Sequence, residues 1–157
     1  MGVVDSGTLH HTCWVVNDVD AVARQMAQSL SVSWSVWTIE PEVCTVHGRT
    51  EPVSFKVALT TIGDSGLELL QPLTGNSVYV EHLNTKGEGF HHTCIFYETH
   101  DAMRSAKDEL TAQGREMIQH GDLGELGEFC YFAFPETDSV LELLYLSELP
   151  PPDETIG

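Results

Sequence analysis

The sequence predicts an α+β fold in which two tandem βαβββ modules form a single domain. Two short strings occur twice: His-His-Thr-Cys at 10–13 and 91–94, and Leu-Glu-Leu-Leu at 67–70 and 141–144. Each half therefore has a histidine segment followed by a glutamate segment, and the apolar residues around both are typical of strands. Because repeated sequence indicates repeated structure, we expect the halves to share one fold and to bring two imidazoles and two carboxylates together.

In the first half, residues 9–16 mix apolar and β-branched side chains and are predicted to form a strand. Asn17 and Asp18 offer oxygen atoms that can cap a helix, and apolar residues recur at helical spacing from there to about residue 30. Further strands are predicted at 34–39, at 43–49 and 53–61 as a hairpin, and at 67–70. The first module therefore covers about residues 8–72.

The second half repeats this order. A strand over 90–97 is followed by a helix that begins near Thr99 or Asp101 and ends at Gly114. Strands are then predicted at 117–120, 128–134 and 140–146, so the second module covers about residues 90–146. Residues 148–157 contain three consecutive prolines and little apolar content, and we expect this tail to be loose.

Composition and charge limit the partners. The 157 residues are 41% apolar, which is enough for a core, but 7 basic residues against 24 acidic ones leave a net charge of −17. This charge repels nucleic acid and anionic membranes, although Arg104, Lys107 and Arg115 lie close enough in sequence to form a local basic patch. With neither an export signal nor a long apolar run, we expect a cytoplasmic protein whose four cysteines are reduced.

Paired βαβββ modules with an early histidine and a late glutamate resemble the vicinal oxygen chelate superfamily. This family includes glyoxalase I, methylmalonyl-CoA epimerase, extradiol dioxygenases and metal-free bleomycin-binding proteins. The resemblance covers about residues 8–146, and the amino-acid sequence at 68–73 and 87–92 is most similar to the epimerase branch. It implies a curved mixed sheet around a central metal cavity, and it implies a homodimer.

The resemblance also assigns the histidine ligands of the metal. In this family the ligand histidine stands directly before the apolar stretch, which corresponds to His11 and His92 in this sequence. The neighbouring His10 and His91 are then expected to face away, because adjacent residues of a strand point to opposite faces.

The two other ligand positions of the family correspond to Glu68 and Glu142. Two imidazoles and two carboxylates suit Zn, Ni, Co, Mn or Mg better than they suit iron or a structural zinc site. In the epimerase branch a further glutamate is a catalytic acid–base group, and counting back along the strand before Glu68 places it at Glu51. Glu51 and Glu142 are therefore the predicted catalytic residues.

The predicted function is a metal-dependent isomerase or epimerase that removes a proton next to a carbonyl of a small chelating acid or thioester. A glyoxalase I-like lactoylglutathione lyase would use the same ligands and remains an alternative. An extradiol-type dioxygenase, with iron held by two histidines and one carboxylate, is disfavoured by the fourth ligand Glu68. A metal-free binding protein is the last alternative. The net charge of −17 argues against CoA as the carrier of the substrate.

Overall fold

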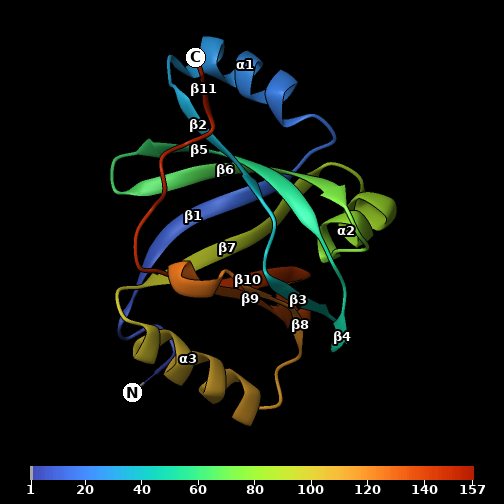
Figure 1. The fold of residues 1–157 in the computed structure, drawn as a ribbon, viewed down its shortest axis with the longest axis vertical. Coiled ribbons are helices and arrows are strands. Elements are labelled where there is room, and N and C mark those ends of the chain that lie inside the picture. Colours follow the sequence, from blue (N-terminus) through green and yellow to red (C-terminus); the bar gives the residue numbers. More distant parts are fainter. Residues whose placement is uncertain (1) are drawn as a thin grey trace.

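The computed structural model describes residues 2–157, which form one eleven-stranded mixed sheet and three α-helices (Figure 1). The helices α1 and α3 lie at opposite ends of the molecule, and the curved sheet lies between them. This arrangement confirms the predicted α+β fold with an open, curved mixed sheet.

The first half contains α1 (Val19–Leu30) and the strands β1 (Gly7–Val15), β2 (Trp34–Ile39), β3 (Val43–Val46), β4 (Arg49–Thr50), β5 (Ser54–Ile62) and β6 (Ser65–Thr74). The helix α2 (Val78–Lys86) lies in the connection, which the sequence analysis left without an element. The second half contains α3 (His100–Ala112) and the strands β7 (Gly89–Tyr97), β8 (Met117–Asp122), β9 (Gly127–Phe134), β10 (Ser139–Leu146) and β11 (Glu154–Ile156). Two single-turn 3-10 helices occupy Gly124–Leu126 and Pro135–Thr137.

The two histidine strands meet in the middle of the sheet. The strand order is β11-β2-β5-β6-β1-β7-β10-β9-β8-β3-β4, and β1 pairs with β7 in antiparallel orientation. On its other side each histidine strand has its own glutamate strand as a parallel neighbour, β6 beside β1 and β10 beside β7. The duplicated strings of the sequence therefore occupy four adjacent strands at the seam between the halves.

The helices α1 and α3 are capped and buried in equivalent ways. Asp18 accepts a hydrogen bond from the backbone N–H of Ala21 at 3.0 Å, and Thr99 accepts one from Ala102 at 3.1 Å. Such caps satisfy N–H groups that have no partner within the helix. Each helix then buries one apolar stripe against the outer face of its own half of the sheet. The inner face remains available for a cavity.

The predicted hairpin of the first half differs from the structure. The strand β3 pairs with β4 and, across the molecule, with β8 of the second half. It does not pair with β5, because both edges of β5 are already occupied by β2 and β6. A strand from the first half thus extends the sheet of the second half. Strand propensity correctly predicted that residues 43–46 form a strand. The partner of this strand depends on which strand has a free edge, and that cannot be derived from propensity.

The C-terminal tail is ordered, which also differs from the prediction. The strand β11 pairs with β2 and buries Ile156. The Asp153 carboxylate accepts a hydrogen bond from the backbone N–H of Thr38 at 2.7 Å, and the Trp37 Nε1–H donates to the Pro150 carbonyl at 3.0 Å. An otherwise open edge of β2 supplies these partners, so the tail is held by backbone pairing although its own apolar content is low.

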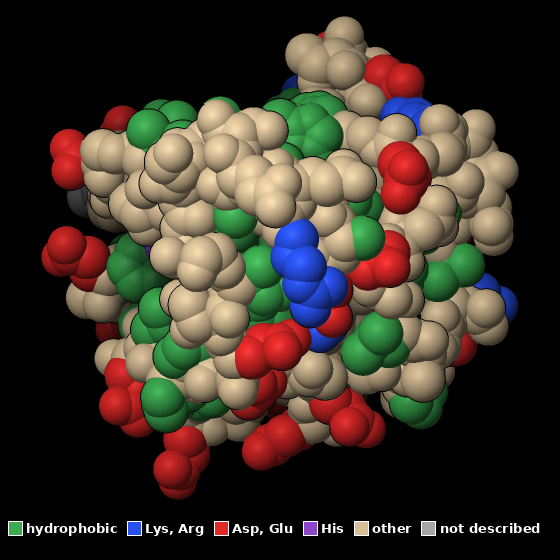
Figure 2. All heavy atoms as spheres, turned by 90° about the horizontal axis from the view of Figure 1, so that it is seen from above, with side chains coloured by type: hydrophobic (Ala, Val, Ile, Leu, Met, Phe, Trp, Pro, Cys, Tyr) green, Lys and Arg blue, Asp and Glu red, His purple; other side chains and the backbone are tan. Residues whose placement is uncertain are grey.

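The surface carries the acidic excess of the sequence. Figure 2 shows many acidic side chains and few basic ones on the face seen from above, and the main basic group there has acidic neighbours. No helix within residues 2–157 has the length and apolar character needed to cross a membrane.

Candidate metal centre

The side chains of His11, Glu68, His92 and Glu142 meet at the seam between the halves. The two Nε2 atoms of His11 and His92 are 3.3 Å apart. Oε2 of Glu142 lies 3.2 Å from Nε2 of His11 and 2.9 Å from Nε2 of His92, and Oε1 of Glu68 lies 3.4 Å and 3.8 Å from the same two atoms. The structure therefore brings the four predicted ligands together, whereas their binding of a metal stays a prediction.

The strand register explains this convergence. Glu68 on β6 is the partner of Cys13 on β1, and Glu142 on β10 is the partner of Cys94 on β7. Each cysteine lies two residues after a predicted ligand histidine, and residues at this spacing share a face of the strand. Each glutamate is consequently placed beside the histidine of its own half. Because β1 and β7 pair in antiparallel orientation, the histidine and glutamate of one half lie opposite those of the other half.

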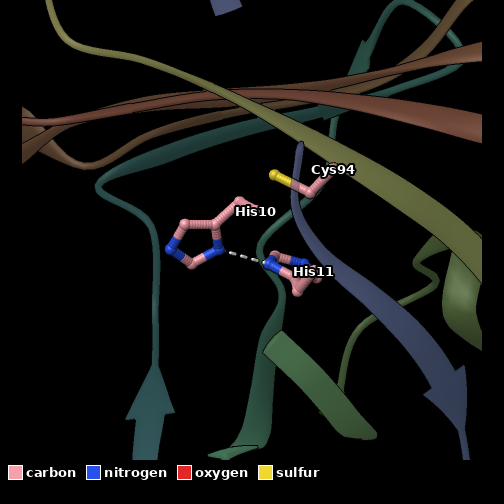
Figure 3. Close-up of side chains that lie close together, drawn as sticks. All are labelled: His10, His11 and Cys94. Atoms are coloured by element: carbon pink, nitrogen blue, oxygen red, sulfur yellow. Dashed lines mark hydrogen bonds between the residues drawn. The ribbon is translucent and has the colours of Figure 1, made fainter. Parts of the chain in front are cut away.

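His10 and His91 do not face away as the strand alternation predicted. Each is the extra residue of a β-bulge, because the register between β1 and β7 skips His10 on one strand and His91 on the other. A bulge interrupts the alternation of side chains. As a result, Nδ1 of His10 lies 2.8 Å from Nδ1 of His11 (Figure 3), and the Nδ1 atoms of His91 and His92 are also 2.8 Å apart.

These short contacts determine how the inner histidines can present their rings. A neutral imidazole has one N–H and one lone pair, so one Nδ1 of each pair must donate and the other accept. If Nδ1 of His11 donates to His10, the neutral form of His11, which binding of a cation would require, has the lone pair of Nε2 directed at the cluster, and the same geometry is available to His92 beside His91. This is the orientation that a metal-binding imidazole needs, and a partner at the other ring nitrogen commonly holds it.

Burial and charge act together in the cluster. Burial alone would lower the pKa of His11, but the Glu68 and Glu142 carboxylates outweigh it and raise the pKa to about 9. Burial would raise the pKa of Glu142, but the imidazoles of His92 and His11 outweigh it and hold that pKa well below its usual range. Both shifts have the same origin, because two carboxylates in a buried place require positive charge beside them.

The donor atoms fit a divalent cation. Oε2 of Glu142 is buried and accepts no aligned hydrogen bond from residues 2–157, although two imidazole nitrogens lie nearby. Ligand atoms of His11, Glu68 and His92 all lie within 4.8 Å of one another. A cation between these nitrogen and oxygen atoms would satisfy the unpaired carboxylate oxygen and offset the two negative charges.

A second group of possible ligands consists of His10, His11 and Cys94 (Figure 3). Burial raises the pKa of the Cys94 thiol well above its usual range, and the nearby Glu142 and Glu68 raise it further. Because the thiolate is the metal-binding form, a thiol held protonated is a poor ligand. Nδ1 of His11 is also already paired with His10. The cluster of two histidines and two glutamates is therefore the better site.

A cavity of about 410 Å³ opens above the cluster. His11, Glu68 and Glu142 line its floor together with Tyr131, and most of the remaining lining is apolar. Residues of the C-terminal tail close one side of it, among them Leu149 and Pro150. The sequence did not predict Tyr131, His10 or the tail as cavity residues. Most of β9 is buried on both faces, so its pattern does not distinguish Tyr131, and the bulge and the tail gave no signal in the sequence.

Glu51 lies apart from the other predicted site residues. Its Oε1 accepts a hydrogen bond from the backbone N–H of Asn76 at 2.9 Å, and Glu51 is not among the cavity-lining residues. The prediction extended the alternation of β5 backwards, but this strand begins at Ser54, after Pro52. The position of Glu51 is therefore set by the turn between β4 and β5, and its catalytic role stays a prediction.

Solved structures resemble this fold over nearly the whole chain. A hypothetical protein from Bacillus halodurans C-125 is 21% identical, with a TM-score of 0.63, and the match covers 93% of this chain and 99% of the other. Methylmalonyl-CoA epimerase from Mycobacterium tuberculosis is 16% identical, with a TM-score of 0.61 and coverage of 94% and 92%. A methylmalonyl-CoA epimerase in complex with methylmalonyl-CoA and NH4+ is 20% identical, with a TM-score of 0.61 and coverage of 94% and 100%.

At these identities the structural likeness shows the fold alone, and no curated protein matches the sequence. The family is shown by a sequence model, which matches residues 10–134, well over half of the chain. The protein therefore belongs to the Glyoxalase/Bleomycin resistance protein/Dioxygenase superfamily.

Proposed function

We propose that the protein is a divalent-metal-dependent isomerase or lyase that removes a proton next to a carbonyl group of a small chelating substrate. The superfamily contains many enzymes as well as proteins without catalytic activity. The observation that carries the proposal is the convergence of two imidazoles and two carboxylates at the floor of a largely apolar cavity. Methylmalonyl-CoA epimerases are among the structural neighbours, and their reaction belongs to this class.

In this proposal His11, Glu68, His92 and Glu142 hold the cation, which is Zn, Ni, Co, Mn or Mg. When bound, such a cation polarises a carbonyl oxygen as a Lewis acid. His92 is fully buried, whereas His11, Glu68 and Glu142 reach the cavity surface. The substrate oxygens therefore approach the site from the side of the cavity, between the two glutamates.

Proton transfer is assigned to the two carboxylates. Glu68 comes from β6 and Glu142 from β10, on either side of the histidine strands, so they approach a substrate from different directions. A reaction that moves a proton between two faces of a carbon atom needs an acid–base group on each side. Glu51 lies outside the cavity lining, and the proposal therefore gives it no step.

The hydroxyl groups of Tyr131 and Tyr79, beside the cluster, are 2.8 Å apart. Burial raises the pKa of both phenols well above their usual range, so they remain neutral. Tyr131 also packs its ring 4.9 Å from the ring of His92, measured between centroids. The pair therefore supports the ring orientation of His92 and keeps water away from its buried side.

The position of Glu68 favours this reaction class over a ring-cleaving dioxygenase. Its Oε1 lies 3.4 Å from Nε2 of His11, where a dioxygenase would need a coordination position for its substrates. A glyoxalase I-like lyase uses the same four ligands and remains within the proposal. A metal-free binding protein is the alternative that lacks chemistry altogether. The cytoplasmic location and the homodimer predicted from the sequence also remain proposals.

The decisive experiment combines metal analysis with proton exchange. Protein purified without a histidine tag is expected to contain about one divalent ion per chain by elemental analysis. In deuterated buffer it should introduce deuterium next to the carbonyl of a suitable acyl thioester, acid or hemithioacetal, followed by NMR, without consuming oxygen. Glu142→Gln should lose both properties. Oxygen uptake with catechols would support the dioxygenase instead, and failure to bind any divalent ion would leave only the binding protein.

A further inference from the structure

We propose that this site accepts a small apolar compound with two neighbouring oxygens and without a charged carrier arm such as CoA. The inference rests on the proposed function, because it names the class of substrate for the same site.

The cavity combines a buried polar cluster with an apolar lining. Glu68 and Glu142 belong to that cluster, the other lining carboxylates are exposed, and β5 contributes the apolar residues Phe55 and Val57. Further wall residues come from the second half, including Leu144 on β10. Such a site complements a ligand with an apolar body and polar atoms at one end. The two oxygens of the ligand would face the histidine and glutamate cluster.

The charges around the cavity repel a phosphate-bearing arm. Glu40, Glu42 and Asp153 line the cavity together with the floor glutamates, and all three are exposed. Among the cavity-lining residues of the part of the chain that the structure describes, none is Lys or Arg. Phosphates are bound by Arg, Lys or backbone N–H groups, so a CoA arm leaving this cavity would meet acidic side chains instead.

The basic residues of the chain are engaged elsewhere. Five of the seven form ion pairs with carboxylates: Lys56 with Asp20 and Glu154, Lys86 with Asp138, Arg104 and Lys107 with Glu128, and Arg115 with Glu136. The basic residues predicted to form a patch around residues 104–115 thus face Glu128 and Glu136, and the Glu128 pairs lie under α3, on the outer face of the sheet. Arg24 and Arg49 are exposed and do not line the cavity.

The ordered tail reinforces the apolar character of the opening. Leu149, Pro150 and Pro151 line the cavity, and the hydrogen bond from Trp37 to the Pro150 carbonyl holds this segment in place. The pairing of β11 with β2 anchors its far end. The opening is therefore bordered by apolar tail residues and by carboxylates, a border that favours entry of an uncharged molecule.

Equilibrium binding tests the inference without relying on turnover. The metal-stripped and the Zn²⁺-loaded full-length proteins are titrated with N-phenyl-1-naphthylamine, an uncharged apolar fluorophore, and separately with propionyl-CoA. We expect the fluorophore to bind and propionyl-CoA to compete poorly, with an affinity at least about tenfold lower. Propionyl-CoA binding as tightly as the fluorophore, or absence of fluorophore binding, would overturn the inference.

Two pairs of variants locate the effect in the cavity. Leu126→Trp fills part of the cavity and should weaken fluorophore binding about tenfold, whereas Leu30→Trp, on the exposed surface of α1, should leave it unchanged. The double change Glu40→Lys and Glu42→Lys should improve propionyl-CoA binding about tenfold. Its control, Asp64→Lys with Glu109→Lys, alters the net charge equally but away from the cavity. Equal effects within either pair would contradict the cavity argument.

The outcomes also separate this inference from the proposed function. If the protein is a binding module, the fluorophore still binds and only metal retention and proton exchange fail. If the protein is an isomerase for a CoA thioester, proton exchange occurs and propionyl-CoA binds tightly. The first result removes the enzyme and keeps the ligand class, and the second does the opposite.

Discussion

The pairs His10–His11 and His91–His92 have the same sequence and the same backbone irregularity but different surroundings. In both pairs the Nδ1 atoms are 2.8 Å apart and the first histidine is a bulge residue. His10 is half-buried and lines the cavity, whereas His91 is 5% exposed. His91 packs against a cluster of aromatic rings that includes Tyr79 and His82 of α2.

The difference between the pairs comes from segments that are not duplicated. The helix α2 lies in the connection between the halves and places two of its rings against His91. In the first half the open cavity adjoins His10, and the tail before β11 forms part of its wall. The duplicated strands therefore determine the cluster of two histidines and two glutamates, while the unique segments determine which side of that cluster adjoins the cavity.

The largest expected effect concerns the two glutamates of the cluster. Glu142 lies closer to both Nε2 atoms than Glu68 does and is more deeply buried. We expect Glu142→Gln to weaken Zn²⁺ binding at least about 100-fold and Glu68→Gln only about tenfold, as measured by isothermal titration. Equal losses of Zn²⁺ affinity would show that the two glutamates contribute equally to metal binding. A larger loss for Glu68→Gln would contradict the expected order of the two residues.

The two outer histidines should separate stability from metal binding. His91→Ala leaves a space in a buried aromatic cluster and should lower the free energy of unfolding by about 2–3 kcal/mol. His10→Ala should change it little, because the side chain is half-buried at the cavity. Both variants should weaken Zn²⁺ binding about tenfold, since each removes the Nδ1 partner of an inner histidine. Urea unfolding of the metal-free proteins and Zn²⁺ titration measure the two effects, and similar unfolding energies for both variants would refute the contrast.

The outer faces of the halves differ in the sign of the charge that is surrounded by opposite charges or hydrogen-bond donors. Under α1, the Lys56 ammonium lies between two carboxylates, at 2.7 Å from Asp20 and 2.8 Å from Glu154. Under α3, the Glu128 carboxylate lies beside the Lys107 ammonium and the imidazoles of His100 and His120. Burial would raise the pKa of Glu128, but hydrogen bonds from His120, Lys107 and His100 outweigh it and lower the pKa to about 2.

The second half should accordingly be the more sensitive to acid. Because the pKa of Glu128 is lower in the folded protein than its usual value of 4.5, its pairing stabilises the fold above about pH 4.5 and is lost as the pH falls toward 2. Glu128→Gln should be less stable at pH 7 and show a smaller further decrease on acidification. Unfolding by urea at pH 7, 4 and 3 measures this. Parallel pH curves for both proteins would assign the acid sensitivity to other groups.

The smallest expected effect concerns Glu51. The carboxamide oxygen of Glu51→Gln can still accept the hydrogen bond from Asn76, so we expect unchanged folding, unchanged metal content and activity within about twofold. Deuterium exchange into substrate provides the measurement, with Glu142→Gln as the inactive reference. Complete loss of exchange in Glu51→Gln, with metal retained, would support the sequence prediction of a catalytic base and would require Glu51 to move toward the cavity.

The sequence predicted the parts of the site that depend on short-range pattern. His11, Glu68, His92 and Glu142 lie in strands whose apolar residues identify them, the duplication links their positions, and the family resemblance selected these four residues as the predicted ligands. Glu51 lies outside such a strand. Its predicted position assumed that the alternation of β5 continues back to residue 51, but β5 begins at Ser54. The side chains of His10 and His91 differ in orientation from the prediction because each is a bulge residue. A bulge arises from the pairing of two strands, so the sequence of one strand does not predict it.

By itself, the sequence determined two similar halves, the order of their main strands and of α1 and α3, and the four polar residues that the apolar strands carry to one face. Periodicity and capping residues are local properties, so they can be read along the chain. The tertiary structure alone decided that β3 crosses to the second half, that β11 closes the free edge of β2, and that α2 covers one histidine pair while the other faces the cavity. These features depend on which strand edges and apolar surfaces remain unsatisfied after the halves have folded, and this competition exists only in three dimensions.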